Sequence, residues 1–257
     1  MKLATWNVNS IRARAEHVAR WLEAEAPDLL LLQEIKCEAA AFPAERFAGL
    51  GYRAEVVGQK SYNGVAILSR PPVVVRARAL PGLAEGAEQA RYLEVAADRL
   101  VVGNLYAPNG NSGGEAGFAY KLAWLEALAA RAAALLAEDV PFVLAGDYNI
   151  CPAEADLAAG ALGPEDALVR PESRSAFRRL LWLGLTDAVR ALHPGGRVFT
   201  FWDYQARAFE RDLGLRIDHA LLSPAAAEAL RAARPDREER AREQPSDHVP
   251  VVVELAL

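Results

Sequence analysis

The sequence predicts an α/β fold in which mixed β-sheets are covered by helices on their outer faces. Residues 1–33 and 115–146 each follow the pattern strand, helix, strand, whereas residues 52–106 form consecutive hairpin-like runs with no helix between them. Strands joined through a helix pair in parallel, and hairpins pair antiparallel. A chain with both kinds of connection therefore builds mixed sheets with the helices outside.

Short runs that are apolar, or that alternate between apolar and polar residues, predict the strands. The run from Leu29 to Leu32 is apolar at every position, which indicates a strand buried on both faces. Strands are expected near residues 2–8, 28–33, 52–57, 64–69, 72–79, 91–97, 100–106, 141–146, 197–202, 216–222 and 249–256.

Apolar residues at helical spacing predict helices near residues 10–25, 115–138, 173–183 and 224–230. The clearest is the 115–138 segment, where leucines recur at helical spacing among alanines of high helix propensity. Ser10 is placed to cap the first helix, and Pro27 to end it.

The composition is that of a globular protein with a large core. The chain has 257 residues, of which 52% are hydrophobic and 25% charged, and no linker rich in Gly, Ser or Pro divides it. We therefore expect a single catalytic domain over residues 1–257. The apolar runs are too short to cross a membrane, and the first residues predict a strand rather than a signal peptide. Two cysteines do not make a disulfide framework, so a cytoplasmic location is expected.

The charge balance limits the kinds of partner. A net charge of −5 argues against non-specific coating of a polyanion. Nucleic-acid binding is still compatible with this charge, because a local basic stripe decides it rather than the total.

Polar side chains end several of the predicted strands. Asn7 follows the first strand, Glu34 the second, Asp147 and Asn149 follow the strand at 141–146, and His248 precedes the last strand. Strand ends that face one cleft are where an α/β scaffold collects catalytic groups. Carboxylates, amides and an imidazole together suit phosphate chemistry assisted by a divalent metal.

Each of these residues also has a structural interpretation. The carboxylate of Glu34, next to a buried strand, needs a partner, which a metal ion or an arginine would supply. Asn7 would supply an oxygen ligand or orient Glu34. An Asx turn explains Asp147 and Asn149 as well as a catalytic pair does.

Strand alternation separates Asp218 from His219. These two residues lie in the predicted strand at 216–222, so their side chains point to opposite faces. Asp218 would then orient the imidazole of His248 as a carboxylate partner, and His219 would pack in the interior.

The chain resembles the exonuclease III family of apurinic/apyrimidinic endonucleases, within the DNase I-like metallophosphodiesterase superfamily. The resemblance covers essentially the whole chain, and ordered motifs are a far stronger signal than any one alone. It implies a four-layered α/β/β/α sandwich of two mixed β-sheets with flanking helices and an active site at one end. It is carried, in family order, by Thr5–Arg12, Leu32–Lys36, Tyr62–Ser69, Tyr106–Gly110, Gly146–Asn149, Leu215–Asp218 and Ser246–His248.

The resemblance also implies roles for residues in these motifs. Glu34 matches the principal metal ligand, and the implied metal site comprises Asn7, Glu34, Asp147, Asn149, Asp247 and His248. The implied catalytic residues are Tyr106 at the leaving group, Asp147 and Asn149 at the attacking water and phosphate, and the Asp218–His248 dyad that stabilises the phosphate. The implied DNA contacts are Tyr62, Arg91, Asn109, Phe201 and Arg216.

Elementary chemistry supports these roles. Hydrolysis of a phosphodiester requires neutralised phosphate charge, an activated water and help for the departing 3′-oxygen. Mg²⁺, with Mn²⁺ as a substitute, supplies the first requirement and assists the third. An aspartate aimed at a water supplies the second. A protonated His248 held by Asp218 would stabilise charge on the phosphate.

The stretch around Phe201 resembles the lesion pocket of the family. Phe201 and Leu215 would form a small apolar pocket for a flipped, base-free sugar, while Arg207, Arg211 and Arg216 contact flanking phosphates. The alternative is that the aromatic residues of 199–202 form a hydrophobic cluster on an edge strand. Alternation allows both, with Phe201 facing the cleft.

The sequence thus predicts a monomeric, Mg²⁺-dependent DNA-repair hydrolase whose partner is double-stranded DNA with abasic sites or blocked 3′ ends. It would incise the backbone 5′ to the abasic site, leaving a 3′-hydroxyl, and have 3′–5′ exonuclease and 3′-end-cleaning activity. One rival is a DNase I-like phosphodiesterase acting on inositol phosphates or sphingomyelin, which should lack the Phe201–Leu215 pocket. The other is an inactive DNA-binding homologue, which should lack Glu34, Asp147 or His248. Asn9 departs from relatives that carry aspartate there, and segment 150–175 matches no family motif closely.

Overall fold

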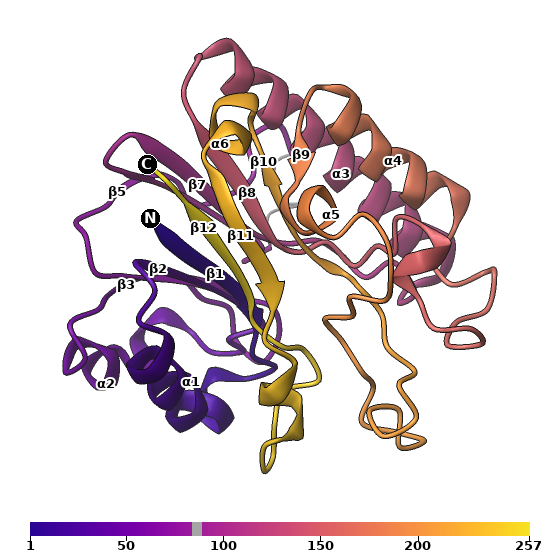
Figure 1. Ribbon diagram of the computed structural model, residues 1–257, viewed down its shortest axis with the longest axis horizontal. Coiled ribbons are helices and arrows are strands. Elements are labelled where there is room, and N and C mark those ends of the chain that lie inside the picture. Colours follow the sequence, from indigo (N-terminus) through magenta and orange to yellow (C-terminus); the bar gives the residue numbers. More distant parts are fainter. Residues whose placement is uncertain (84–88) are drawn as a thin grey trace.

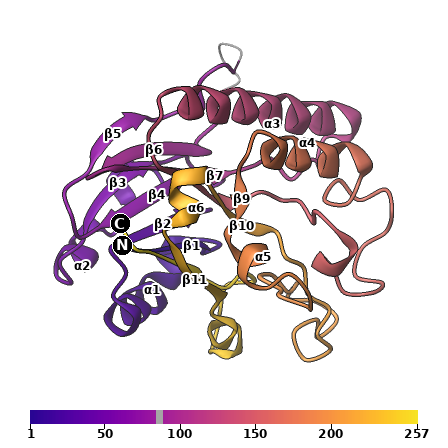
Figure 2. The same ribbon diagram turned by 45° about the horizontal axis from the view of Figure 1, so that its top comes forward.

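A computed structural model describes residues 1–83 and 89–257. In it, two six-stranded mixed β-sheets pack face to face between two outer layers of helices. Figure 1 and Figure 2 show α1 and α2 outside one sheet and α3 and α4 outside the other. The predicted four-layered α/β/β/α sandwich is confirmed.

The first sheet joins the two ends of the chain. Its order is β11-β12-β1-β2-β4-β3, with β1 parallel to β2 and antiparallel to β12. Its strands are β1 (Lys2–Asn7), β2 (Leu29–Gln33), β3 (Arg53–Val57), β4 (Val65–Ser69), β11 (Leu230–Pro235) and β12 (Val251–Leu255).

The second sheet is built from the middle of the chain. Its order is β5-β6-β7-β8-β10-β9, with β7 parallel to β8 and the other neighbours antiparallel. Its strands are β5 (Val74–Ala77), β6 (Tyr92–Ala97), β7 (Leu100–Tyr106), β8 (Phe142–Asp147), β9 (Thr186–Asp187) and β10 (Asp218–Leu222).

The helices are interspersed with the strands along the chain. Within residues 1–83 and 89–257 there are also three short 3₁₀ helices, at Ala39–Ala41, Glu154–Asp156 and Arg237–Ala241. The α-helices are α1 (Ile11–Glu25), α2 (Ala44–Ala48), α3 (Gly114–Ala137), α4 (Pro171–Trp182), α5 (Ala188–Leu192) and α6 (Pro224–Glu228).

Strand alternation in β2 shows why the four layers form. Leu29 and Leu31 belong to the core between the two sheets, whereas Leu30 and Leu32 belong to the core under α1 and α2. A third apolar core lies between the second sheet and the helices α3 and α4. A strand that is apolar on both faces is stable only when other layers cover both faces of its sheet, as the sequence indicated.

Several local predictions were wrong. Residues 197–202 form no regular strand, because Phe201 makes only isolated bridges, to Leu215 and His248. Strand β10 begins at residue 218 rather than 216, since the main-chain N–H of Arg216 donates to Asp156 O outside the sheet. The elements α2, α5, β9 and β11 were not predicted; most are five residues or shorter and their patterns are weak. Ser10 occupies the N-cap position of α1, but its side chain makes no capping hydrogen bond.

Among the described residues, no helix is long and apolar enough to cross a membrane.

Candidate active site

Strand pairing brings the polar strand ends together at one end of the sandwich. In the first sheet, β1 ends at Asn7 and its parallel neighbour β2 ends directly before Glu34. In the second sheet, β7 lies parallel to β8, which places Tyr106 opposite Asp147. Strand β10 starts at this same end, with Asp218 opposite Asp147. Residues from distant parts of the chain therefore meet, as the sequence predicted.

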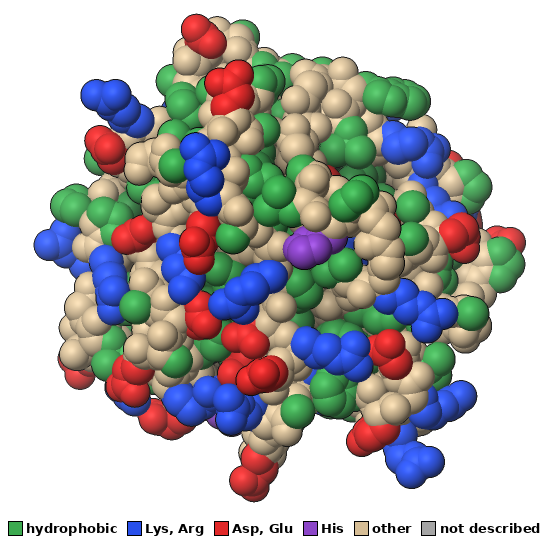
Figure 3. Space-filling model, in the orientation of Figure 1, with side chains coloured by type: hydrophobic (Ala, Val, Ile, Leu, Met, Phe, Trp, Pro, Cys, Tyr) green, Lys and Arg blue, Asp and Glu red, His purple; other side chains and the backbone are tan. Residues whose placement is uncertain are grey.

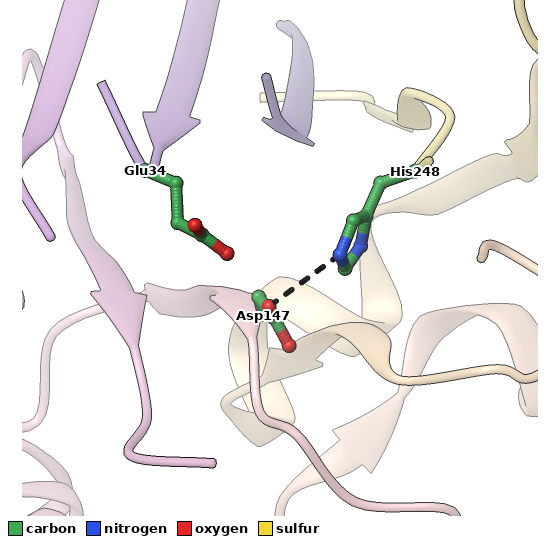
Figure 4. Close-up of side chains that lie close together, drawn as sticks. All are labelled: Glu34, Asp147 and His248. Carbon is green, nitrogen blue, oxygen red and sulfur yellow. Dashed lines mark ion pairs between the residues drawn. The ribbon is translucent and has the colours of Figure 1, made fainter. Parts of the chain in front are cut away.

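Glu34, Asp147 and His248 form the centre of this site (Figure 4). One ligand atom of each lies within 4.8 Å of those of the other two. Asp147 and His248 are 1% and 4% exposed, whereas Glu34 is half-buried. The Nε2 atom of His248 lies 3.8 Å from Asp147 Oδ2. Of the three side chains, that of Glu34 is therefore the one most accessible to solvent.

The side-chain amide of Asn7 bridges the two acids. Its Nδ2 donates to Glu34 Oε1 at 2.8 Å and to Asp147 Oδ2 at 3.0 Å. Its Oδ1 accepts a hydrogen bond from the main-chain N–H of Asn9. Of the two roles left open for Asn7, this geometry favours orientation of Glu34 over direct ligation of a metal.

His248 and Asp218 form a buried dyad. The Nδ1 atom of His248 lies 2.8 Å from Asp218 Oδ2 and 3.1 Å from Oδ1. Burial by itself lowers the pKa of His248, but the charge and hydrogen bond of Asp218 outweigh it, with help from Asp147, and raise the pKa to about 10. The imidazole is therefore a cation near neutral pH. An imidazolium has no free lone pair, so in this state His248 suits a phosphate oxygen better than a metal ion.

The two central carboxylates differ in their tendency to ionise. Burial, with the nearby charges of Asp218 and Glu34, raises the pKa of Asp147 to about 7 against the opposing effects of His248 and Asn7. Burial opposes ionisation of Glu34 as well. The charge of Lys36 and the hydrogen bonds from Asn7 and Lys36 outweigh that effect and hold the pKa of Glu34 below its usual value. Asp147 thus resembles a proton acceptor, and Glu34 a permanent anion.

Lys36 is a site residue to which the sequence assigned no role. Its Nζ lies 2.9 Å from Glu34 Oε2 and 2.5 Å from Asn9 Oδ1. Asp247 accepts from Asn9 Nδ2 at 3.2 Å and lies outside the cluster of Glu34, Asp147 and His248. Lys36 is one of only four lysines in the chain and falls in the motif of Glu34, which is the signal that could have indicated it.

Two side-chain amides that are hydrogen-bonded to each other lie next to Asp147. Asn109 Nδ2 donates to Asn149 Oδ1 at 3.0 Å, and Asn149 Nδ2 donates to the carbonyl of Ala107 at 3.0 Å. The main-chain N–H of Asn149 donates to Asp147 Oδ1 at 2.8 Å. This last bond is the Asx turn that the sequence left open, and it coexists with the placement of Asn149 in the site.

Tyr106 completes the site from strand β7. Arg91 donates to the carbonyl of Tyr106 at 3.3 Å, and its guanidinium lies 4.6 Å from the centre of the tyrosine ring. Burial, with the charges of Glu34 and Asp147, raises the pKa of Tyr106 well above its usual range, so the phenol keeps its proton. Tyr62 is 71% exposed and makes no part of this cluster.

Phe201 and Leu215 lie beside the dyad. They exchange two main-chain hydrogen bonds of 2.9 Å, and the ring centroid of Phe201 lies 4.9 Å from that of His248 in an edge-on arrangement. Phe201 is half-buried and Leu215 is 4% exposed. The structure therefore places both next to the site, and their role in holding a sugar stays a prediction.

The prediction that Arg216 contacts DNA is wrong. Arg216 is 1% exposed, and its guanidinium contacts Asp156 Oδ1 at 2.6 Å, Asp187 Oδ2 at 2.7 Å and His219 Nδ1 at 2.9 Å. Two buried carboxylates already neutralise this cation, so it is not available to a phosphate. His219 is buried as expected, and its Nε2 contacts the carbonyl of Ile150 at 2.9 Å.

The donor set fits a hard divalent cation. Glu34 and Asp147 offer carboxylate oxygens within a few ångströms of each other, and the half-buried position of Glu34 leaves room for water ligands. Mg²⁺ typically binds through one or two carboxylates and keeps several waters. These two acids are therefore the residues that would hold it.

The fold and the site define a protein of the class that hydrolyses phosphate esters. The chain matches the Endonuclease/Exonuclease/phosphatase family over residues 4–248. Because this match spans nearly all of its length, the chain belongs to that family. The resemblance drawn from the seven motifs is thereby confirmed.

Individual proteins of this family are similar to the chain over its full length. Exodeoxyribonuclease III of Haemophilus influenzae is 34% identical over 266 residues, which cover 99% of this chain and 100% of that protein. The structure of an AP endonuclease from Archaeoglobus fulgidus superimposes with a TM-score of 0.93 at 34% identity, with 100% of both chains covered. That of the 3′ phosphatase NExo from Neisseria, bound to a product DNA hairpin, superimposes with a TM-score of 0.92 at 40% identity, again with 100% of both chains covered.

Proposed function

We propose that this protein is a DNA-repair nuclease that cleaves the phosphodiester backbone 5′ to abasic sites. It also removes nucleotides and blocking groups from 3′ ends at the same site. The observation that carries the proposal is the cluster of Glu34, Asp147 and the Asp218–His248 dyad at one end of the sandwich, next to Phe201. Relatives of full-length similarity that act as an exodeoxyribonuclease, an AP endonuclease and a 3′ phosphatase support it.

The residues of the site can perform this hydrolysis in one displacement. Asp147, which lies at the centre of the cluster beside His248, accepts a proton from the attacking water. The imidazolium of His248 contacts a phosphate oxygen and stabilises the charge that grows there. The water oxygen bonds to phosphorus while the bond from phosphorus to the 3′-oxygen breaks, and the 3′-oxygen takes up a proton from solvent, leaving a 3′-hydroxyl and a 5′-phosphate.

Two neutral groups and a metal complete the proposed machinery. Asn149 donates a hydrogen bond to the water or the scissile phosphate, and the protonated phenol of Tyr106 lies at the leaving group. Mg²⁺, for which Mn²⁺ can substitute, would be held by Glu34 and Asp147 and would supply charge neutralisation on the phosphate.

The proposed substrate is duplex DNA, bound by a monomer in the cytoplasm. Figure 3 shows basic and acidic side chains interspersed on the face in view, and both kinds lie near the lower end, where the loops of residues 203–213 and 237–246 project in Figure 1. Arg207 and Arg211 are exposed on the first of these loops. Local basic groups of this kind bind a phosphate backbone even on an acidic protein.

Phe201 is the residue proposed to recognise the lesion. A flipped sugar without a base would pack against its ring, while a normal nucleotide would not fit. Phe201→Ala should therefore reduce incision at an abasic analogue about tenfold more than cleavage at a plain 3′ end. An equal loss on the two substrates would remove Phe201 from lesion recognition.

The test is cleavage of a labelled duplex that carries one abasic analogue, with Mg²⁺ or with EDTA. An intact duplex and a duplex with a 3′-phosphate end are run in parallel. A single metal-dependent nick 5′ to the lesion is expected. Progressive 3′ shortening without that nick would move the enzyme to the exonucleases, and no cleavage of any DNA would direct attention to other phosphodiesters.

A further inference from the structure

A buried lysine lies beneath the proposed site and has no role in the scheme above. Lys121, the eighth residue of α3, is 0% exposed. Its Nζ donates to the carbonyl of Asn109 at 2.9 Å and to the carbonyl of Asn149 at 2.6 Å. These are its hydrogen-bond partners within residues 1–83 and 89–257. A buried amine that serves two main-chain carbonyls, with no carboxylate bonded to it, is costly, so its placement calls for an explanation.

The two carbonyls belong to the two amide residues of the site. Asn109 lies in the loop after β7 and Asn149 in the loop after β8, and their side chains are joined by the 3.0 Å hydrogen bond between Asn109 Nδ2 and Asn149 Oδ1. Lys121 therefore closes a ring: it holds both residues by their main chains, while they hold each other by their side chains. The ring fixes the separation of the two loops at the level of the proposed phosphate site.

The main chain of Asn149 needs such support. Its φ of 52° lies in the left-handed region, which is uncommon for a residue other than glycine and persists when the surroundings determine it. Its N–H is bound to Asp147, its side-chain amide to Ala107, and its carbonyl to Lys121. Lys121 thus holds the one main-chain group of Asn149 that would otherwise be free.

The loop after β7 is also shaped around the lysine. Gly110 has a φ of +90°, and a Cβ added there would come within 2.7 Å of Lys121 Cδ and 3.1 Å of Ala167 Cβ. The methylene chain of Lys121 therefore fits directly against the main chain beside Asn109. Burial lowers the pKa of Lys121 to about 7. A neutral amine still has two N–H groups for two carbonyls, so the arrangement does not depend on its charge.

We propose that Lys121 is a positioning residue, which sets Asn109 and Asn149 in the geometry that catalysis requires by holding their main-chain carbonyls from below. This inference rests on the proposed function, because it gives Asn149 its task at the phosphate. A displacement of about 1 Å in such a group can cost roughly 100-fold in rate.

The test compares Lys121→Met with Leu128→Ala. Methionine keeps the length and the apolar stem of Lys121 but has no N–H donor. Leu128 lies seven residues further along the same helix, is 0% exposed, and belongs to the apolar core under α3 rather than to the hydrogen-bonded ring. Its truncation lowers the melting temperature without touching the ring, so it measures the effect of lost stability alone.

Incision of the abasic duplex is measured for both variants with Mg²⁺, together with the NMR signals of the side-chain amides of Asn109 and Asn149. We expect Lys121→Met to lower kcat about 10–100-fold and to shift both amide signals. Leu128→Ala should keep kcat within about twofold and leave the amide signals in place. In an Asn149→Ala background the effect of Lys121→Met should shrink to a few-fold, because the two substitutions act through one group.

Unchanged amide signals in Lys121→Met, with kcat equal to that of Leu128→Ala, would overturn the inference. If the wild-type protein does not cleave the abasic duplex, the proposed function fails, but the amide signals still decide whether Lys121 positions the two residues. If Lys121→Met does not fold, Lys121→Leu, which also lacks an N–H donor, takes its place: shifted amide signals support the inference, and unchanged signals overturn it.

Discussion

The charge of His248 depends on Asp218, and replacing that aspartate is the sharpest test of the site. Asp218→Asn keeps the size of the side chain and removes its charge. The pKa of His248, about 10 rather than the ordinary 6.5, corresponds to roughly 5 kcal/mol in favour of the imidazolium. The largest opposing effect is burial, which favours the neutral ring. Without Asp218 the ring should therefore be neutral at pH 7.5.

A neutral imidazole cannot supply positive charge to the phosphate. Loss of one preorganised group that stabilises transition-state charge typically costs about 10²–10³-fold in kcat, and we expect that loss for Asp218→Asn. The assay is single-lesion incision at pH 7.5 with saturating Mg²⁺. An NMR titration of the imidazole protons of His248, in the variant and the wild type, measures the charge directly.

Asp236→Asn is the matched control. Asp236 Oδ2 accepts a hydrogen bond from the ring N–H of Trp21 at 2.9 Å and is not among the charges that raise the pKa of His248, so the change removes a carboxylate that does not act on the imidazole. It should leave kcat within about twofold. If Asp218→Asn keeps kcat within about threefold of wild type while His248 still titrates near pH 10, Asp218 does not set the charge of His248.

Three further predictions test other parts of the site. Glu34→Gln should abolish the rise in melting temperature that Mg²⁺ produces in the wild type, because it removes the permanent anion of the proposed metal site; an equal rise would exclude Glu34 as a ligand. Asp147→Asn should stabilise the protein in EDTA at pH 8 by about 2–4 kcal/mol, and by little at pH 4. The folded pKa of Asp147, about 7, lies above its ordinary 3.8, so its contribution to stability is complete below pH 3.8 and is lost as the pH rises through 7. Denaturant unfolding of both proteins at the two pH values measures the difference, and a larger stabilisation at pH 4 than at pH 8 would contradict this prediction. Arg216→Met should lower the free energy of unfolding by about 3–5 kcal/mol, because Asp156 and Asp187 lose their buried partner. It should also leave the salt dependence of DNA binding unchanged, and a reduced salt slope would return Arg216 to the DNA interface.

The layers of the fold follow from local patterns in the sequence. Strand β2 is apolar on both faces, so both faces of its sheet must be covered. The leucine spacing of α3 requires an apolar partner on one side of that helix. Short elements such as α5 and β9 were missed because two to five residues carry too little periodicity. The false strand at 197–202 has the alternation of a strand, but its hydrogen bonds go to Leu215, Asp247 and other loop residues.

Arg216 shows where a motif misleads. It stands two residues before Asp218 in a motif shared with DNA-repair enzymes, and its charge suggested a phosphate contact. Its actual partners, Asp156 and Asp187, come from a segment that matched no motif and from the short strand β9. No local pattern of residues 150–187 indicates that two of its acids are buried beneath the site.

The sequence by itself determined which residue types stand at the strand ends, because strand length and alternation place Asn7, Glu34, Asp147 and Asp218 by local rules. Only the tertiary structure decided which of these groups are charged or protonated and which residues hold them in place. The charge of His248, the proton of Asp147 and the support of Asn149 by Lys121 depend on contacts between residues up to 140 positions apart or on burial by other layers. Electrostatic energies fall off with distance in space rather than along the chain, so they become defined only when both sheets are in place.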